Sequence, residues 1–266
     1  MPISRSLRAG FRCILSPKRT TTNDRVMKDE PLILAIETAT RAGGIALARG
    51  EEILSSIAGD ASVSHSTNLL EMVEAALRNA GVTMAEVDLF AVAVGPGSFT
   101  GLRIGLATAK AFAVHLHREV IGVPTLAAVA HTLQFDGDIV SLLPAGRGEV
   151  FAQRFAVRDG MVKTIDEPQH LSPAEVIAKY TGVGVLRYAG EGVRMLTEQA
   201  AGSGNSYSSV SELSMLAPSI AVLAARLYRE GKAVAPHDLQ AVYVRASDAE
   251  INERWQQQKQ SPPAHN

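Results

Sequence analysis

A glycine-rich segment at residues 95–101, GPGSFTG, stands between an apolar run and a segment of helical pattern. Glycine lets an anion approach the backbone closely, and the first turn of a helix exposes free amide groups, so Gly95, Gly97, Ser98 and Thr100 could hold a phosphate group. The segment lacks the Lys-Ser/Thr pair of a Walker A loop and the spacing of a dinucleotide-binding fingerprint. We therefore favour a simpler interpretation, in which the glycines allow a tight turn and Ser98 or Thr100 caps the helix, and keep phosphate binding as the alternative.

An acidic residue, Glu37, ends the first strongly apolar run, residues 31–37, and is followed by Thr38, Ala39 and Thr40. In an actin-like nucleotide-binding fold, the turn at this point approaches phosphate and its acid serves magnesium. A single acid without a glycine-rich turn is a weak form of that pattern. Glu37 and the glycine-rich segment are therefore candidates for the vestige of a phosphate site.

The other residue types that carry chemistry show no catalytic spacing. The seven histidines include neither HxxxH nor HExxH, the spacings of metal sites carried on a helix. The single cysteine, Cys13, excludes a cysteine-rich metal site and an internal disulfide. The GxSxG nucleophile elbow does not occur in the sequence. We predict no catalytic residue, no metal and no cofactor.

Residues 65–80 have the pattern of an amphipathic helix with an unusually wide apolar side. The apolar arc spans roughly 160°, against about 100° for the usual stripe that faces a core. Its members are Leu69, Leu70, Met72, Val73, Ala76, Leu77 and Ala80. The surplus apolar surface calls for a second neighbour, and His65 is more simply a residue of the helix start than a catalyst.

A second predicted helix, residues 100–116, follows the glycine-rich segment. Gly101, Gly105, Ala109 and Ala113 recur in it at four-residue spacing and line one side with small side chains. Another helix could approach that side closely, and burial against the protein's own sheet is the alternative. The two helices together favour a partner protein, with contact residues His65, Leu69, Met72, Val73, Ala76, Gly101, Gly105, Ala109 and Ala113.

Composition limits the class of protein. The chain has 266 residues, of which 46% are hydrophobic and 20% charged, so it has enough apolar surface to fold. Its formal net charge of -1 gives no broad positive field for nonspecific binding of nucleic acid. No run of about 18 apolar residues and no secretory signal occurs, and together with the lone cysteine this predicts a cytoplasmic protein.

Residues 1–30 differ from the rest because they are rich in arginine, serine and threonine and show no apolar periodicity. We expect a disordered basic extension. It could be an organellar transit peptide, but we favour a misassigned start, since Met27 stands just before the first apolar run. Without residues 1–28, which carry seven basic residues and one acidic residue, the formal net charge becomes -7.

Local patterns predict an α/β protein with two lobes, the first at residues 31–133 and the second at 134–250, whose end could return to the first lobe. Residues 251–266 read as a disordered tail. We expect strands at 31–37, 43–48, 51–58, 88–94, 139–143, 149–157 and 185–189, with a hairpin turn at 159–160. Further helices are expected at 125–133, after the capping box at 172–175, and at 213–229; a capping box at 83–86 starts only a short turn. Residues 202–209 are left without structure.

Six blocks occur in the order and spacing of the TsaB family, which the chain resembles from about residue 32 to residue 246. They are ILAIETAT (33–40), SHSTNLLEMV (64–73), GPGSFTGLRIG (95–105), GVPTLAAVA (122–130), GRGEVF (146–151) and YVR (243–245). The third block is very specific. The resemblance implies the two-lobed fold of the actin, sugar-kinase and Hsp70-like ATPases, with mixed sheets flanked by helices.

The resemblance also implies a role. TsaB is similar to TsaD, which transfers a threonylcarbamoyl group to the adenosine beside the anticodon of tRNA, and resembles a catalytically degenerate copy of it. Family members pair with TsaD through the first two helices of the first lobe, here residues 65–80 and 100–116, and the ATPase TsaE joins that pair. We therefore expect a non-catalytic subunit that meets tRNA only through its partner and could form a homodimer when alone.

Two departures from related sequences bear on the second lobe and on catalysis. Many relatives have an acid where this chain has Pro144, which removes a residue that could have served a site there. The pair of metal-binding histidines of TsaD has no counterpart. The alternatives are an ATP-binding enzyme that uses residues 95–100 and, more remotely, the glycoprotease activity once attached to this superfamily.

Overall fold

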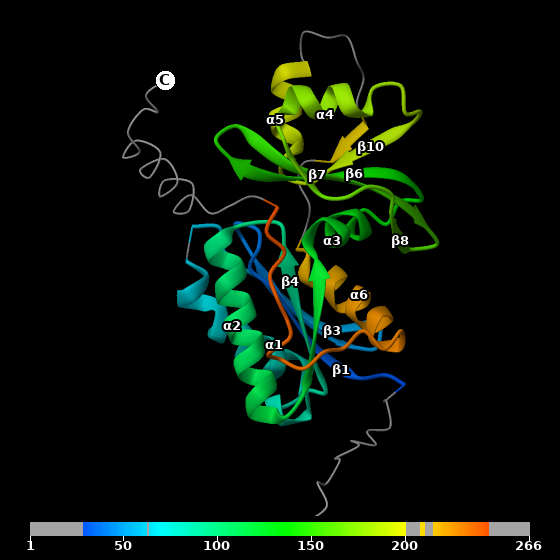
Figure 1. Ribbon diagram of the computed structural model, residues 1–266. Helices are drawn as coiled ribbons and strands as arrows, with labels where there is room; N and C mark the ends of the chain where they lie inside the picture. Colours follow the sequence, from blue (N-terminus) through cyan, green and yellow to red (C-terminus); the bar gives the residue numbers. More distant parts are fainter. Residues whose placement is uncertain (1–28, 63, 201–207, 211–214, 245–266) are drawn as a thin grey trace, which may run out of the picture.

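The computed structural model describes residues 29–62, 64–200, 208–210 and 215–244, which form two lobes, one above the other in Figure 1. Both lobes contain a mixed β-sheet flanked by helices, which confirms the predicted fold class. Most of the predicted basic extension, with Met27, the tail at 251–266 and Arg245 of the YVR block lie outside the described residues. None of the described helices is long and apolar enough to cross a membrane.

The sheet of the first lobe has the strand order β3-β2-β1-β4-β5. Its strands are β1 (Leu32–Glu37), β2 (Gly44–Arg49), β3 (Glu52–Ala58), β4 (Leu89–Gly95) and β5 (Glu119–Pro124). The first three form an antiparallel meander, as predicted, and β4 and β5 continue the sheet in parallel with β1. Every residue of β1 and β4 is buried, because these central strands are covered on both faces.

The strand β5 was not predicted, because Gly122 and Pro124 interrupt the pattern expected of a strand. Gly122 is nevertheless needed there: a Cβ atom at this position would lie 2.5 Å from Val94 Cγ1 of the neighbouring strand. Pro124 stands at the last position of β5, where the ladder to β4 shifts register. The residues that obscure the pattern are thus those that fit the strand into the sheet.

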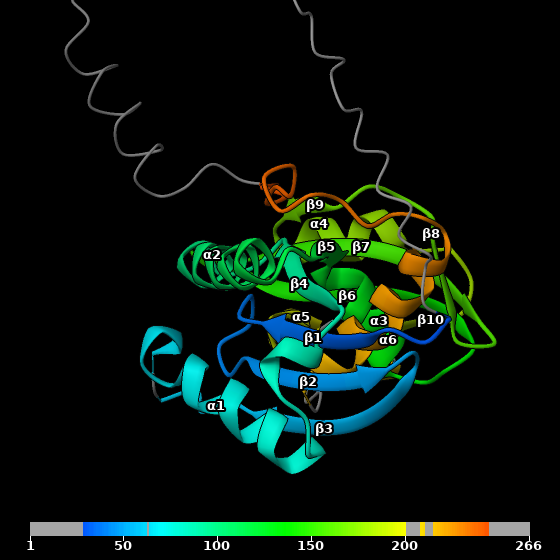
Figure 2. The same cartoon turned by 90° about the horizontal axis from the view of Figure 1, so that it is seen from below.

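Helices α1 (His65–Ala80) and α2 (Phe99–Leu116) cover one face of the first sheet, and α6 (Ala217–Arg229) covers the other (Figure 2). The first two agree with the predicted helices. The short 3-10 helix at Met84–Glu86 has the predicted capping box at Thr83. The last helix begins at Ala217, and Pro218 suits its first turn; the predicted start at residue 213 lies outside the described residues.

The second lobe contains a sheet of order β11-β10-β6-β7-β8, with β9 paired to β7. Its elements are β6 (Gly137–Gly146), β7 (Glu149–Arg158), β8 (Met161–Thr164), β9 (Gln169–Leu171), α4 (Pro173–Tyr180), β10 (Leu186–Ala189), α5 (Val193–Ala200) and β11 (Ser208–Val210). The strands predicted at 139–143, 149–157 and 185–189 and the helix after the capping box are confirmed. The expectation that 202–209 lacks structure is wrong at Ser208 and Ser209, and residues 202–207 lie outside the described part.

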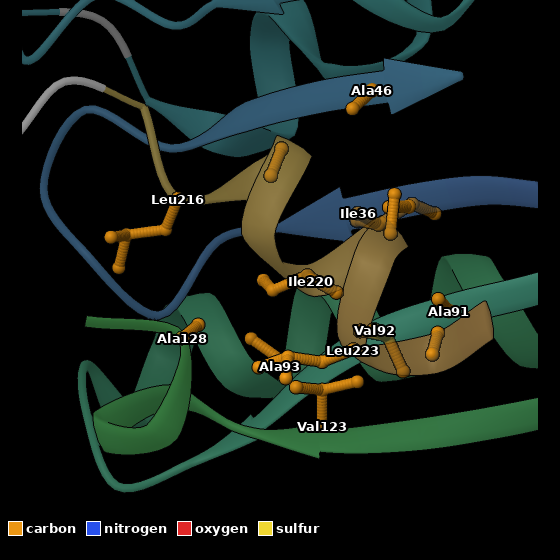
Figure 3. Packing of buried hydrophobic residues seen from close by; sticks show 14 of the residues in the cluster. Ile36, Ala46, Ala91, Val92, Ala93, Val123, Ala128, Leu216, Ile220 and Leu223 are labelled. Atoms are coloured by element: carbon orange, nitrogen blue, oxygen red, sulfur yellow. The ribbon is translucent and has the colours of Figure 1, made fainter. Parts of the chain in front are cut away.

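Helix α3 (Thr125–Thr132) lies between the lobes and contacts strands of both sheets. Apolar residues of the second lobe, including Phe155 and Ile139, belong to the same buried cluster as the first-lobe strands. Figure 3 shows Ile220 and Leu223 of α6 in that cluster beside Ala93 and Val123. The lobes therefore share one continuous core around α3 and α6.

The last described segment, residues 215–244, returns to the first lobe. After the second-lobe sheet, α6 packs on β1 and β2, and Val234 forms an antiparallel bridge with Val120 of β5. Farther on, the backbone N–H of Val242 donates to the carbonyl of Val94 at 2.7 Å. Residues 215–244 consequently belong with the first lobe in space, although they follow the second lobe in sequence.

Candidate functional site

A cavity of about 790 Å³ lies between the lobes. The first lobe contributes the turn after β1, the first turns of α1 and α2, and the segment 242–244. The second lobe contributes the end of β6, Phe151 and Glu191, and Glu191 is the only acid among the described lining residues. Several of the predicted site residues line the cavity, namely His65, Gly97, Ser98, Thr100 and Gly101.

The glycine-rich segment packs against the turn after β1. A Cβ atom at Gly97 would lie 2.6 Å from the carbonyl oxygen of Ala39, and Ser98 N–H donates to the same oxygen at 2.8 Å. The side chain of Ser98 accepts from the N–H of Gly101 at 3.2 Å and so caps α2. Ser98 and Thr100 line the cavity, whereas Gly95 is buried. Gly97 therefore allows the segment to approach the turn after β1 closely, and Ser98 caps α2. Both observations agree with the interpretation of a tight turn and a helix cap.

Glu37 does not line the cavity. Its side chain is 1% exposed and accepts two hydrogen bonds from Thr40, from the backbone N–H at 2.8 Å and from the hydroxyl at 2.6 Å. Burial raises the pKa of the Glu37 carboxyl, and the two Thr40 hydrogen bonds oppose that rise. Glu37, predicted as the remnant of a magnesium-binding acid, therefore stabilises the turn that follows β1.

His65 links the start of α1 to the same turn. Its Nε2 lies 2.9 Å from the carbonyl oxygen of Thr40, and a Cβ atom at Gly43 would lie 2.8 Å from its ring. The ring is partly exposed and lines the cavity. This placement agrees with a residue that positions the first turn of α1.

The structure corrects the rest of the predicted contact residues. All four of the α1 group and all four small residues of α2 are buried in the first lobe itself: Leu69, Met72, Val73, Ala76, Gly101, Gly105, Ala109 and Ala113. A Cβ atom at Gly105, for example, would lie 2.3 Å from Thr38 Oγ1. The small side chains let α2 approach its own sheet, which was the alternative considered from the sequence.

Other residues of the two helices face outward. Leu70 of α1 is 59% exposed and Val114 of α2 is 62% exposed. Ala107 and Ala111 of α2 are exposed as well. Ala107, Ala111 and Val114 were not predicted, because α2 is apolar on nearly every side and periodicity did not distinguish its inner face from its outer one.

An aromatic stack covers the first turn of α2. The rings of Phe99 and Tyr243 lie 5.2 Å apart between centroids, and the guanidinium of Arg103 lies 4.0 Å from the centroid of the Phe99 ring. Tyr243 is 48% exposed and Val242 is 42% exposed. From the sequence, Tyr243 was noted only as part of the YVR block. In the structure its ring packs against Phe99 of the glycine-rich segment.

On the second lobe, Pro144 is exposed and lines the cavity, where β6 ends beside a register shift in its pairing with β7. Glu149 of the GRGEVF block lies 2.8 Å from His170 Nε2, and the His170 ring packs on Phe151. Within the described ranges, no three His, Cys, Asp or Glu side chains gather as metal ligands would.

Similarity to known proteins agrees with this architecture. A family model described as TsaD, tRNA N6-adenosine threonylcarbamoyltransferase, matches residues 55–263. The tRNA threonylcarbamoyladenosine biosynthesis protein TsaB of Bacillus subtilis is 30% identical over 144 residues, which cover 54% of this chain and 63% of that protein. TsaB of Escherichia coli is 27% identical over 220 residues, or 80% of this chain and 94% of that protein. The chain belongs to the TsaB family.

A solved structure supports the same family assignment. YeaZ from Pseudomonas aeruginosa superimposes with a TM-score of 0.70 and 26% identity, over 80% of this chain and 99% of that one. The match to the Bacillus subtilis TsaB spans less than two thirds of that protein's length. In this TsaB-family chain, the buried small-residue side of α2 and the Thr38–Thr40 turn form one packed unit beside the cavity.

Proposed function

We propose that this chain is a non-catalytic subunit in the biosynthesis of threonylcarbamoyladenosine in tRNA and that it acts by binding TsaD. The Bacillus subtilis and Escherichia coli relatives are named for that biosynthesis. The observation that carries the proposal is the outer face of α2, an exposed ridge with two alanines and a valine that the described part of the chain leaves uncovered.

This outer face consists of Thr100, Arg103, Ala107, Ala111 and Val114, all of them exposed. They recur every three or four residues and therefore follow one side of the helix. Alanine side chains let a partner helix approach to about 8 Å between axes, which is the close end of helix packing. The face thus fits a helix with larger apolar side chains.

Helix α1 extends this surface, because α1 and α2 contact each other. Leu70 of α1 is exposed although it is a large apolar residue, while the other exposed positions of α1 are polar. Two adjacent helices with uncovered apolar side chains suit a partner that also offers two helices, in the manner of a four-helix arrangement.

Two contacts near the cavity support a role without catalysis. The Glu37 carboxylate is occupied by Thr40, and the glycine-rich turn is held by Thr38 and Ala39. Both groups that could have served phosphate or magnesium are committed to the fold. Binding preferentially to the competent conformer of TsaD would raise the population of that conformer, which is how a subunit without chemistry can activate an enzyme.

The remaining partners follow from the same proposal. TsaE would bind the pair of this chain and TsaD, and tRNA would be reached through the partner. The charge of residues 29–266, formally -7, favours contact with tRNA through a more basic protein.

Reconstitution tests the proposal. Purified TsaD, TsaE and an ANN-decoding tRNA should produce modified adenosine only when this chain is present. Ala107→Glu should abolish co-purification with TsaD, because a charge would be buried in the contact. The matched control is Ala178→Glu, which changes an exposed alanine on α4 of the second lobe. Full modification without the chain, or equal binding by both variants, would contradict the proposal.

A second copy of the chain could occupy the same face when TsaD is absent. Light scattering of the isolated protein should then report a dimer that Ala107→Glu converts to a monomer. A dimer that persists in this variant would use another surface.

The competing function is ATP-dependent catalysis in the cavity between the lobes, favoured by the hydroxyls of Ser98 and Thr100 and the guanidinium of Arg41 that line it. Calorimetric titration with ATP and magnesium separates the two functions. Micromolar binding with turnover by the isolated chain would favour the enzyme.

A further inference from the structure

Arg226 of α6 contacts both lobes at the end away from the cavity. Its Nε and Nη2 donate to Glu51 Oε2 at 2.9 and 2.7 Å. Its Nη1 donates to the carbonyl oxygen of Gly160. Glu51 belongs to the turn between β2 and β3 of the first lobe, and Gly160 to the turn between β7 and β8 of the second.

The second-lobe contact is made by a rigid turn. Asp159 and Gly160 have φ angles of 50° and 70°, the left-handed values that a two-residue hairpin turn requires. The N–H of Asp159 donates to Asp136 Oδ1 at 3.0 Å, which ties the turn to the start of β6. The carbonyl of Gly160 therefore has a fixed position in its lobe, and a bond to it restrains the lobe as a whole.

The strands β6 and β7 connect this contact to the cavity. At about 3.3 Å per residue, ten-residue strands reach about 30 Å, and both strands have ten residues. The Arg226 contact lies at the Arg158 end of β7, whereas Pro144 and Phe151, near the other end of the same ribbon, line the cavity. Between the two ends, α3 packs against β6 and β7 and against strands of the first lobe.

We propose that Arg226 is an inter-lobe clamp that sets the width of the cavity. The strands β6 and β7 pack on α3, and Arg226 ties one end of this pair to Glu51 of the first lobe. With one end tied and the middle supported, the other end, which lines the cavity, is held at a fixed distance from the first turn of α2. The planar guanidinium suits this task because its five N–H donors can serve two acceptors in fixed directions at once. This inference is independent of the proposal that the chain binds TsaD.

Arg229 provides a matched control within the same cluster. It also pairs with Glu51, through Oε1, and it lies on the same helix. Among its described contacts none reaches the second lobe. Loss of Arg229 removes a positive charge and an ion pair but leaves the bridge to Gly160 in place.

The test measures the distance across the cavity in the full chain. Spin labels would be attached at Thr100→Cys and Glu191→Cys, exposed positions that line the cavity from opposite lobes, in a Cys13→Ser background. Electron-electron double resonance should give a narrow distance distribution for the parent. We expect Arg226→Gln to broaden it, because the freed ribbon can tilt about α3, while Arg229→Gln leaves it unchanged.

A conservative variant keeps the test decisive if Arg226→Gln folds poorly. Arg226→Lys retains the charge opposite Glu51, but one ammonium group does not reproduce the forked geometry toward both acceptors. It should therefore also broaden the distribution, with an unchanged circular dichroism spectrum. The clamp is refuted if folded Arg226 variants keep the parent distribution, or if Arg229→Gln broadens it as much as they do.

Discussion

A Cβ atom at Gly101 would lie 1.8 Å from the carbonyl oxygen of Thr38, which is far inside van der Waals contact. The hydroxyl of Thr38 in turn donates to the carbonyl oxygen of Gly101 at 2.8 Å. The first turn of α2 and the end of β1 are thus in direct backbone contact, and the absence of a side chain at Gly101 permits it.

Gly101→Ala should destabilise the protein for this reason. Because the obstacle is backbone rather than a flexible side chain, α2 must move away from β1, at a cost of roughly 1–3 kcal/mol or more. Urea denaturation measures the change in the free energy of unfolding. Ala107→Ser, an exposed change on the same helix, is the control. Equal stability of Gly101→Ala and the parent would show that the contact is not tight.

Glu37→Gln should leave both folding and activity in a reconstituted modification assay close to those of the parent. An amide oxygen can still accept from the Thr40 N–H, and the amide N–H can donate to the Thr40 hydroxyl in place of the present bond. Glu37→Ala should lose roughly 1–3 kcal/mol of stability, because two donors lose their acceptor. A Gln variant that is fully folded yet inactive would instead indicate a chemical role for the carboxylate.

His131 makes stability dependent on pH. It belongs to α3, and its Nδ1 lies 3.0 Å from Oγ of Ser219 on α6. Burial, followed by the positive charge of Arg226, lowers the pKa of His131 from 6.5 to about 4. The unfolded chain therefore binds a proton more readily than the fold does, so this contribution is complete above pH 6.5 and is lost as the pH falls toward 4.

The loss due to His131 should amount to at most roughly 3 kcal/mol, the equivalent of the shift in pKa. Denaturation at pH 7 and pH 5 should show a smaller pH effect for His131→Gln, which can keep a hydrogen bond to Ser219 but does not titrate. A parent and a variant with the same pH dependence would contradict the assignment.

The sequence predicted well those elements that depend on the pattern of neighbouring residues. The meander of β1 to β3, the bounds of α1 and the capping boxes at Thr83 and Ser172 depend on neighbours in the chain, and the structure confirms them. Strands β8 and β9 were missed because they are short, with 4 and 3 residues, and mostly polar, and owe their existence to pairing with β7.

The candidate site was less predictable, since it depends on which side of a helix meets which sheet. A stripe of small residues allows close approach but does not name the neighbour, and in α2 that neighbour is β1 and β4 of the same chain. The same limit applies to Glu37: its position at the end of a strand was visible, but the two bonds from Thr40 that occupy it come from the conformation of the turn.

A pair of alanines on α2 separates the inner face from the outer one. Ala109 has no exposed surface, whereas Ala111 is exposed on the outer face. Ala109→Leu should cost roughly 1–3 kcal/mol of stability through overpacking. Ala111→Leu should leave the free energy of unfolding within about 0.5 kcal/mol, as surface changes usually do, and should weaken binding to TsaD by blocking close approach of its helix. Denaturation and calorimetric titration of both variants give the two readouts. If Ala111→Leu binds TsaD with the parent's affinity while remaining folded, the outer face of α2 is not the docking surface.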